Sequence, residues 1–123
     1  MISGCRIHER HAGGVHVLDL EGPLTNGDAI GALRARVRGL VENGQVNLVL
    51  NLEGVPYIDS SGLGELVRVH TTLLHHHGEL KLVNATRRLR DLLVMTRLAP
   101  IFESFDSEAG AIASFTQPRG EIV

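Results

Sequence analysis

Apolar residues follow two spacings along the chain, and these spacings predict strands that alternate with helices. Val46, Leu48, Leu50 and Leu52 occupy every second position of a predicted buried strand over 46–52. Two longer segments instead show helical spacing of apolar residues, namely Ile30, Leu33, Val37, Leu40 and Val41 in the first, and Leu63, Leu66, Val67, His70, Leu73 and Leu74 in the second.

Turn and capping residues divide the chain into further elements. Before the first helix, the pattern predicts a strand over 5–9, a turn over 11–14 and a strand over 15–21. Helix caps are expected at Asn26 or Asp28, at Asp59, Ser60 or Ser61, at Asn84 or Thr86, and at Ser107. Strands are also predicted over 79–83 and 101–105, and a last helix reaches Phe115. We expect one domain over residues 1–115 and a C-terminal tail over 116–123.

This order of elements predicts an α/β domain with a small mixed sheet, in which an opening hairpin precedes parallel βαβ units. One face of each predicted strand is apolar, and the opposite face is largely polar. Asn47 and Asn51 lie with Val49 on that polar face, as do Glu79 and Lys81 in the strand 79–83. We therefore expect helices to cover mainly the apolar face. Right-handed crossovers on one side imply strands in sequential order. Such a sheet has no reversal of strand order, which argues against a deep nucleotide or substrate pocket.

Composition restricts the classes of function. The 123 residues include no Trp and only four Phe and Tyr residues, so the core must be aliphatic. A net charge of −2 argues against a nucleic-acid-binding protein, which needs a concentrated basic surface. The single cysteine, Cys5, and the lack of an apolar run of about 18 residues indicate a cytoplasmic protein rather than a membrane protein.

The stretch Asp59-Ser60-Ser61-Gly62-Leu63-Gly64 lies where a buried strand gives way to an apolar-striped helix. A helix N-terminus has free backbone N–H groups and the positive end of the helix dipole. Asp and Ser are common there because their oxygens cap the first turn. A second interpretation is that one of the hydroxyls accepts a phosphoryl group, which would add roughly −1.5 to −2 charge at a place suited to anions.

Two chemical alternatives have weaker support. A hydrolase with Ser60 or Ser61 as nucleophile lacks the Gly-x-Ser-x-Gly pattern, and no histidine is marked as its base. The tract His75–His77 suggests metal binding, yet consecutive helical residues point about 100° apart and cannot converge on one ion. We therefore expect no enzyme activity, metal or cofactor. The arginines at 34, 36 and 38 and at 87, 88 and 90 are expected to form solvated helix faces, with a partner surface on part of them as the alternative.

The string Ile58-Asp59-Ser60-Ser61-Gly62-Leu63-Gly64, which follows the apolar strand 48–52, strongly resembles the STAS-domain family, in particular bacterial anti-sigma-factor antagonists. The resemblance extends from the opening hairpin to Phe115 and includes 78–82 and 92–98. It implies a small α/β domain with a mixed sheet and helices packed on it. The periodicity of the chain predicts the same fold class independently.

The resemblance also implies a function and its residues. In that family, the unphosphorylated antagonist binds an anti-sigma factor that is also a serine/threonine kinase and so frees the sigma factor. Phosphorylation of the Ser that follows the Asp releases the antagonist, and a phosphatase resets it. Carried over to this chain, the phosphorylated residue is Ser60, and the docking surface includes Asp59, Ser61, Gly62, Leu63 and Gly64.

One loop departs from the family pattern. Many antagonists carry Gly-Glu-Leu-Asp after the second strand, whereas this chain has Gly22-Pro23-Leu24-Thr25 and lacks both acidic residues. Thr25 is expected to belong to the partner-binding surface. The alternative function keeps the fold: a STAS subunit of a transporter or of a stress-signalling scaffold, bound constitutively and never phosphorylated.

Overall fold

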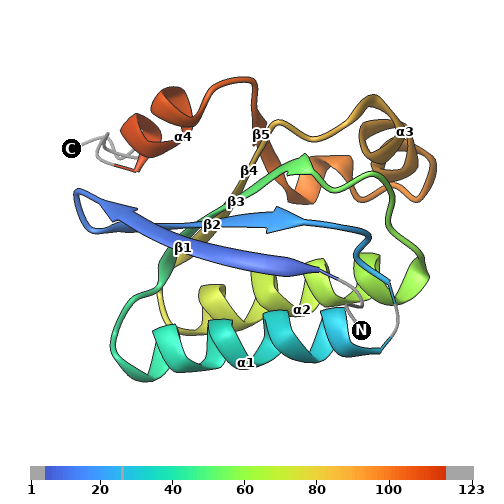
Figure 1. Ribbon diagram of the computed structural model, residues 1–123. Coiled ribbons are helices and arrows are strands. Elements are labelled where there is room, and N and C mark those ends of the chain that lie inside the picture. The colour runs from blue at the N-terminus through green and yellow to red at the C-terminus, as the bar shows by residue number, and fades with distance from the viewer. Residues whose placement is uncertain (1–4, 26, 116–123) are drawn as a thin grey trace.

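A five-stranded sheet forms the centre of the computed structural model, which describes residues 5–25 and 27–115 (Figure 1). The strand order follows the sequence, and β1 pairs antiparallel with β2 whereas all later pairs are parallel. The opening hairpin and the sequential order are therefore confirmed. The strands are β1 (Arg6–Ala12), β2 (Val15–Glu21), β3 (Asn47–Gly54), β4 (Glu79–Val83) and β5 (Glu103–Phe105).

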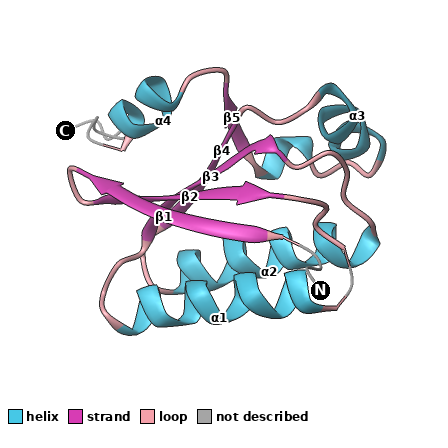
Figure 2. Ribbon diagram, viewed as in Figure 1, coloured by secondary structure: helices cyan, strands magenta, loops and turns pink. Residues whose placement is uncertain are grey.

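Helices cover both faces of the sheet (Figure 2). Helices α1 (Asp28–Glu42) and α2 (Ser60–His75) run side by side under one face. Helix α4 (Glu108–Ser114) lies on the opposite face. Between β4 and β5 the chain forms helix α3 (Arg87–Met95) and then the short 3-10 helix η1 (Ala99–Ile101). No helix within the described residues is long and apolar enough to cross a membrane. The proposed tail, 116–123, lies outside the described residues.

The first hairpin is tighter than the sequence predicted. The turn was expected over 11–14, but β1 continues through Ala12, which pairs with Val15. Only Gly13 and Gly14 connect the strands, and both have positive φ, 58° and 82°. A two-residue turn of this kind matches the right-handed twist of the strands, and glycine adopts it without strain. The hairpin therefore pairs three residues of β1, 10–12, beyond the predicted strand.

Side-chain caps were predicted correctly for three of the four helices. The alternatives resolve to Asp59 for α2 and Thr86 for α3, and Ser107 caps α4. For α1 the prediction was wrong at Asp28, which is the first helical residue, while Gly27 is the N-cap and makes no side-chain cap. Asn26 lies outside the described residues. Among the described residues, α1 therefore begins without a side-chain cap.

The main core is aliphatic, as expected, and lies between the sheet and helices α1 to α3. Leu18, Leu48 and Leu50 are fully buried at its centre. The predicted stripe of α2 was wrong at one position, because Leu74 is 51% exposed while Val69 is buried. Residue 69 is three positions after Leu66 and four before Leu73, so it continues the same helix face. His70 is half-buried, and its ring packs against Phe102, as expected for a packing residue.

The second face of the sheet is drier than predicted. Helix α4 covers part of it and buries Val15, Val17, Val49, Val83 and Ala111 in a second cluster. Lys81, expected on a solvent-exposed face, is 1% exposed. Its Nζ lies 3.0 Å from Glu103 and 4.6 Å from the centre of the Phe115 ring. Sequence alternation placed Lys81 on the correct face, but it could not show that a seven-residue helix would cover it.

Arg10 on β1 fastens α4 to the sheet. Its guanidinium donates to both oxygens of Asp19, at 2.7 and 2.8 Å, and to both oxygens of Glu108, at 2.9 and 2.7 Å. These bonds hold the pKa of the Asp19 and Glu108 carboxyl groups below their usual values, and the carboxylates in turn raise the pKa of Arg10. Bidentate arginine–carboxylate pairs are among the stronger charged contacts in proteins.

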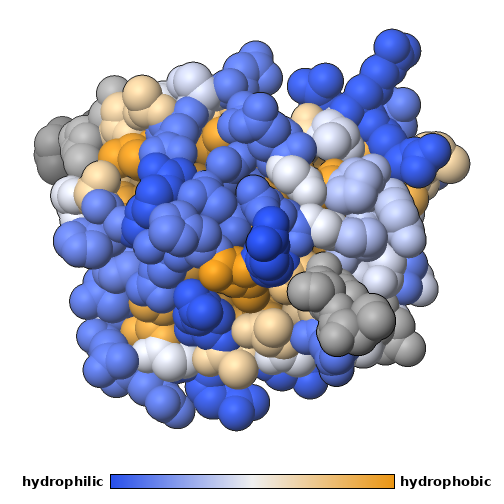
Figure 3. Space-filling view, in the orientation of Figure 1, coloured by the Kyte–Doolittle hydropathy of each residue, from blue (hydrophilic) through white to orange (hydrophobic). Residues whose placement is uncertain are grey.

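The outer edge of β1 carries mostly polar side chains. Arg6, His8, Glu9 and His11 are exposed there. Figure 3 shows mostly hydrophilic residues on the face that carries β1, with a small hydrophobic patch near its centre. Charged residues on an edge strand discourage pairing with strands of other chains. The sheet is therefore protected on this side against edge-to-edge association.

The Arg10 bonds predict a specific pH dependence of stability. Arg10→Gln should lower the free energy of unfolding by roughly 1–2 kcal/mol at pH 7, the size expected for partly exposed charged hydrogen bonds. Because the pKa values of Asp19 and Glu108 are lowered from 3.8 and 4.5, this contribution is present above those values. It is lost as the pH falls through the lower pKa values of the folded state. Denaturant unfolding of both proteins at pH 7 and at acidic pH measures the difference, and a constant difference would contradict the assignment.

Candidate functional site

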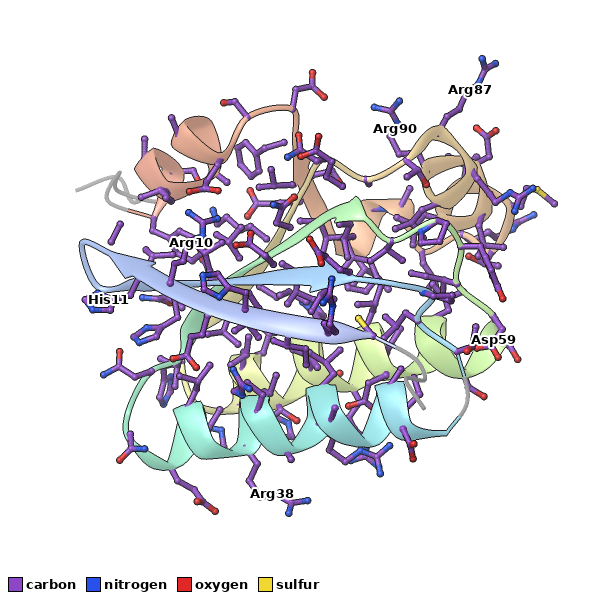
Figure 4. All side chains as sticks on the ribbon, viewed as in Figure 1. Arg10, His11, Arg38, Asp59, Arg87 and Arg90 are labelled. Carbon is purple, nitrogen blue, oxygen red and sulfur yellow. The ribbon has the colours of Figure 1, made fainter. Side chains whose placement is uncertain are left out.

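The candidate site is the N-terminus of α2, directly after the turn that follows β3. Asp59 caps the helix, because its Oδ1 accepts from the Gly62 amide at 2.9 Å and its carbonyl accepts from the Leu63 amide at 2.9 Å. Figure 4 shows Asp59 at this end of α2. Of the three residues that the sequence offered as the cap of this helix, Asp59 is therefore the one that caps it. Neither serine hydroxyl is needed for the cap.

Ser60 and Ser61 are the first two residues of α2, and both are exposed. In an α-helix the amides at these positions have no partner within the helix, and the helix dipole adds positive potential. Within the described residues, the Ser60 hydroxyl makes no hydrogen bond to a histidine. His75, His76 and His77 lie at the opposite end of α2 and are exposed. The geometry is that of an accessible hydroxyl, not of an activated nucleophile.

The loop after β2 packs directly against the start of α2. The Leu24 amide donates to the Tyr57 carbonyl at 3.1 Å, and Leu24 forms a parallel bridge with Ile58. A Cβ added to Gly62 would lie 2.1 Å from the Leu24 carbonyl oxygen, so only glycine fits here. Thr25, one residue further along, is half-buried and belongs to the same loop that contacts the first turn of α2. The structure therefore places the predicted Thr25 in the loop that packs against the motif.

The remaining motif residues have different surroundings. Leu63 is buried in the main core, and Gly62 is buried under Leu24. Gly64 is exposed, and a Cβ added to it would meet nothing within 4 Å. The accessible part of the motif therefore consists of Ser60, Ser61 and Gly64, while Gly62 and Leu63 hold the helix end in position.

Exposed apolar side chains occur at the same end of the domain, where loops leave the parallel strands. Tyr57, directly before the motif, is 45% exposed, and on α3 Val94 and Met95 are 65% and 77% exposed. Sequence reasoning missed them as surface residues. Tyr57 could have been suspected, since an aromatic residue in a polar loop is often a contact residue, whereas Val94 and Met95 only extend an apolar helix pattern.

The described surface has open hollows elsewhere. One of about 660 Å³ is lined by polar and charged residues of β1, β2 and β3, including Arg6, His8, Asp19, Asn51 and Glu53. Among the described residues, no three His, Cys, Asp or Glu side chains form a group that could hold a metal ion. Neither feature adds a chemical group to the serine motif 59–64, whose accessible groups are the hydroxyls at the start of α2.

The two motif glycines give a matched test of this geometry. Gly62→Ala forces a Cβ into the Leu24 carbonyl and should lower the free energy of unfolding by about 3 kcal/mol, the upper part of the range for overpacked sites. Gly64→Ala meets no atom and should raise it by roughly 0.5–1 kcal/mol, because alanine favours the helix. Denaturant unfolding measures both, and equal effects would contradict the packing described.

Comparison with known proteins gives one family. The family model described as the STAS domain matches residues 6–111. Among solved structures, TM1081 of Thermotoga maritima, a proposed anti-sigma factor antagonist, has a TM-score of 0.84 at 20% identity, over 90% of this chain and 95% of that one.

Three further structures, from two proteins, have the same fold. The anti-sigma factor antagonist SpoIIAA of Bacillus, solved unphosphorylated and phosphorylated, gives TM-scores of 0.72 and 0.71 at 21% and 22% identity. Both matches cover 89% of this chain, and they cover 97% and 99% of the SpoIIAA chains. A sulfate transporter family protein of Wolinella succinogenes gives 0.67 at 20% identity, over 82% of this chain and 84% of that one. At these identities the structures show the fold alone. From the family model and the fold together, this chain belongs to the STAS domain family.

Proposed function

We propose that this protein is a phosphorylation-switched anti-sigma-factor antagonist. While Ser60 is unmodified, it binds and sequesters an anti-sigma factor that is also a serine kinase. The observation that supports the proposal is the arrangement at the start of α2. Asp59 caps the helix, so the exposed Ser60 hydroxyl is accessible to a kinase. The output is binding and not catalysis, and the protein acts in the cytoplasm.

The modification itself needs no group from this chain beyond Ser60. The Ser60 Oγ forms a bond to the γ-phosphorus of ATP, the bond from that phosphorus to ADP breaks, and the hydroxyl proton passes to a base of the kinase. A phosphatase then restores the hydroxyl with water. SpoIIAA, which shares the fold, exists in a phosphorylated form, and this supports phosphorylation as chemistry that the fold accommodates.

Phosphorylation should change binding far more than folding. A phosphate at an exposed helix N-terminus gains about 0.3–1 kcal/mol from the dipole. The Asp59 carboxylate opposes it by repulsion of comparable, solvent-screened size. These terms nearly cancel within the domain. In a docked interface the dianion must instead lose its water, which commonly costs several kcal/mol.

A constitutive subunit of a transporter or stress-signalling scaffold is the second candidate. Two observations favour it: the fold occurs in a sulfate transporter family protein, and the loop Gly22–Thr25 beside the motif has no acidic residue. In that case Ser60 would serve only as an exposed helix residue, and a partner would bind this end of the domain permanently.

Phosphosite mapping separates the two candidates. After incubation with ATP and with kinases captured from the native cell, phosphate is expected on Ser60. Ser60→Ala should abolish it. Ser61→Ala is the matched control, because Ser61 is also exposed but lies one position further along the helix, and this variant should still be phosphorylated on Ser60. Phosphate on Ser61 alone, or on neither serine, would contradict the proposal.

Ser60→Asp should separate binding from stability. Its free energy of unfolding should stay within about 1 kcal/mol of wild type, because the dipole and Asp59 act in opposite directions. Its affinity for the kinase partner should fall at least tenfold, which corresponds to about 1.4 kcal/mol. Thermal melts and titration calorimetry measure the two quantities. A large drop in melting temperature, or unchanged affinity, would refute the switch.

A further inference from the structure

The two edges of the sheet differ in character (Figure 1). β1 forms one edge with seven residues, and its exposed charged and histidine side chains discourage pairing with another strand. β5 forms the other edge with only three residues, and two exposed apolar side chains lie beside it. These are Leu74 of α2 and Ile101 of η1, with 51% and 40% of their surface exposed. An unpaired edge with apolar side chains beside it is suited to accept a strand from another chain.

The backbone of Ser104 faces away from the rest of the sheet. The Asn84 amide donates to the Phe105 carbonyl at 3.1 Å, so the backbone groups of Phe105 are directed at β4. In a parallel pair such as β4 and β5, the backbone groups of successive residues point alternately toward the partner strand and away from it. The N–H and C=O of the exposed Ser104 are therefore directed at the free edge, where they offer one donor and one acceptor.

A hollow of about 260 Å³ adjoins this edge, between the last turns of α2 and η1. Leu74, Pro100 and Ile101 form its accessible apolar walls, since all three are exposed. The hollow lies on the face of the sheet that α2 covers. An apolar side chain of an added strand would therefore lie against Leu74 and Ile101 when it points to this face.

The other face of the edge is acidic. The carboxylates of Glu79 and Glu103 both approach one cation, the buried Lys81, at 3.3 and 3.0 Å, so the group carries a net negative charge. Glu103 shares a face with Phe105, which packs in the second cluster under α4, and its side chain is 51% exposed. A basic side chain of an added strand would be attracted there. A second copy of this chain would instead bring further carboxylates to the same edge, and like charges oppose that pairing.

We infer that β5 accepts an extended segment of another protein as a sixth strand, and that this segment alternates basic and apolar residues. Its backbone bonds to the N–H and C=O of Ser104. Its apolar side chains lie on Leu74 and Ile101, and its basic side chains pair with Glu103. The alternation follows from strand geometry, because successive side chains point to opposite faces. Ser60 and Leu74 lie at opposite ends of α2, so this site is separate from the phosphorylation motif.

Titration with a synthetic peptide tests the site on the unmodified protein, so the result does not depend on Ser60. The probe is the hexapeptide Thr-Lys-Val-Lys-Val-Thr with blocked ends. Two-dimensional NMR of the isotope-labelled protein should show saturable shifts at 101–106 and around Leu74, and none along β1. The same peptide with glutamate in place of both lysines should bind at least tenfold more weakly. Absence of saturable shifts, or equal binding of the two peptides, would overturn the inference.

Variants test the backbone and the apolar contacts separately. Ser104→Pro removes only an N–H that faces the free edge, so the bonds between β4 and β5 remain and peptide binding should fall at least tenfold. Ile101→Ser removes an apolar wall and should have a similar effect. Met95→Ser, an exposed apolar change on α3, is the matched control and should bind as wild type does. If Ser104→Pro does not fold, Ile101→Ser decides, and wild-type affinity in that variant would refute the site.

Sedimentation equilibrium tests the other occupant, a second copy of the chain. At the concentration of the NMR samples, the wild-type protein should form no dimer through this edge. A dimer that Ile101→Ser dissociates, found together with an absence of peptide shifts, would assign the edge to self-association and overturn the inference.

Discussion

The candidate site depends on one close backbone contact, that between Leu24 and Gly62. The carbonyl of Leu24 occupies the space that any other residue at position 62 would fill. The loop after β2 is consequently pressed against the first turn of α2, and the Leu24 amide is bonded to the turn before it. Thr25 lies in the loop after β2, whereas Tyr57 and the two serines lie within one short run, 57–61, and this contact holds the two segments together. Backbone packing between the two segments thus helps to fix the position of the α2 N-terminus.

Asp59 adds a second constraint. Because its carboxylate already holds the Gly62 amide, the first turn of α2 is stable without help from Ser60 or Ser61. A serine that caps its own helix would lose that bond on modification, and the helix end would fray. In the proposed switch, the capping carboxylate and the hydroxyl to be modified belong to neighbouring residues, so modification of the hydroxyl leaves the cap in place.

Much of this arrangement could be predicted from the sequence. The strand at 46–52 and the stripe from Leu63 onward placed the serines at a helix start, and the local chemistry of Asp and Ser narrowed the cap to three residues. What could not be predicted depends on contacts between distant segments. The burial of Lys81 requires α4 to cross the sheet, and the approach of Leu24 to Gly62 requires two loops to meet. The buried Glu65 is likewise hidden in the sequence, where it looks like an ordinary polar residue of an amphipathic helix.

Arg10 joins the two ends of the domain. It connects β1, the first strand, to Glu108 in the last helix, 98 positions later in the chain. Such a contact closes a loop that includes nearly the whole described domain, and this closure costs chain entropy. The cost is offset only after the strands between the two residues have paired into the sheet. The bond should therefore form late in folding and break early in unfolding. We expect the outer strand and the last helix to open as one unit, while the main core between the sheet and helices α1 and α2 stays closed.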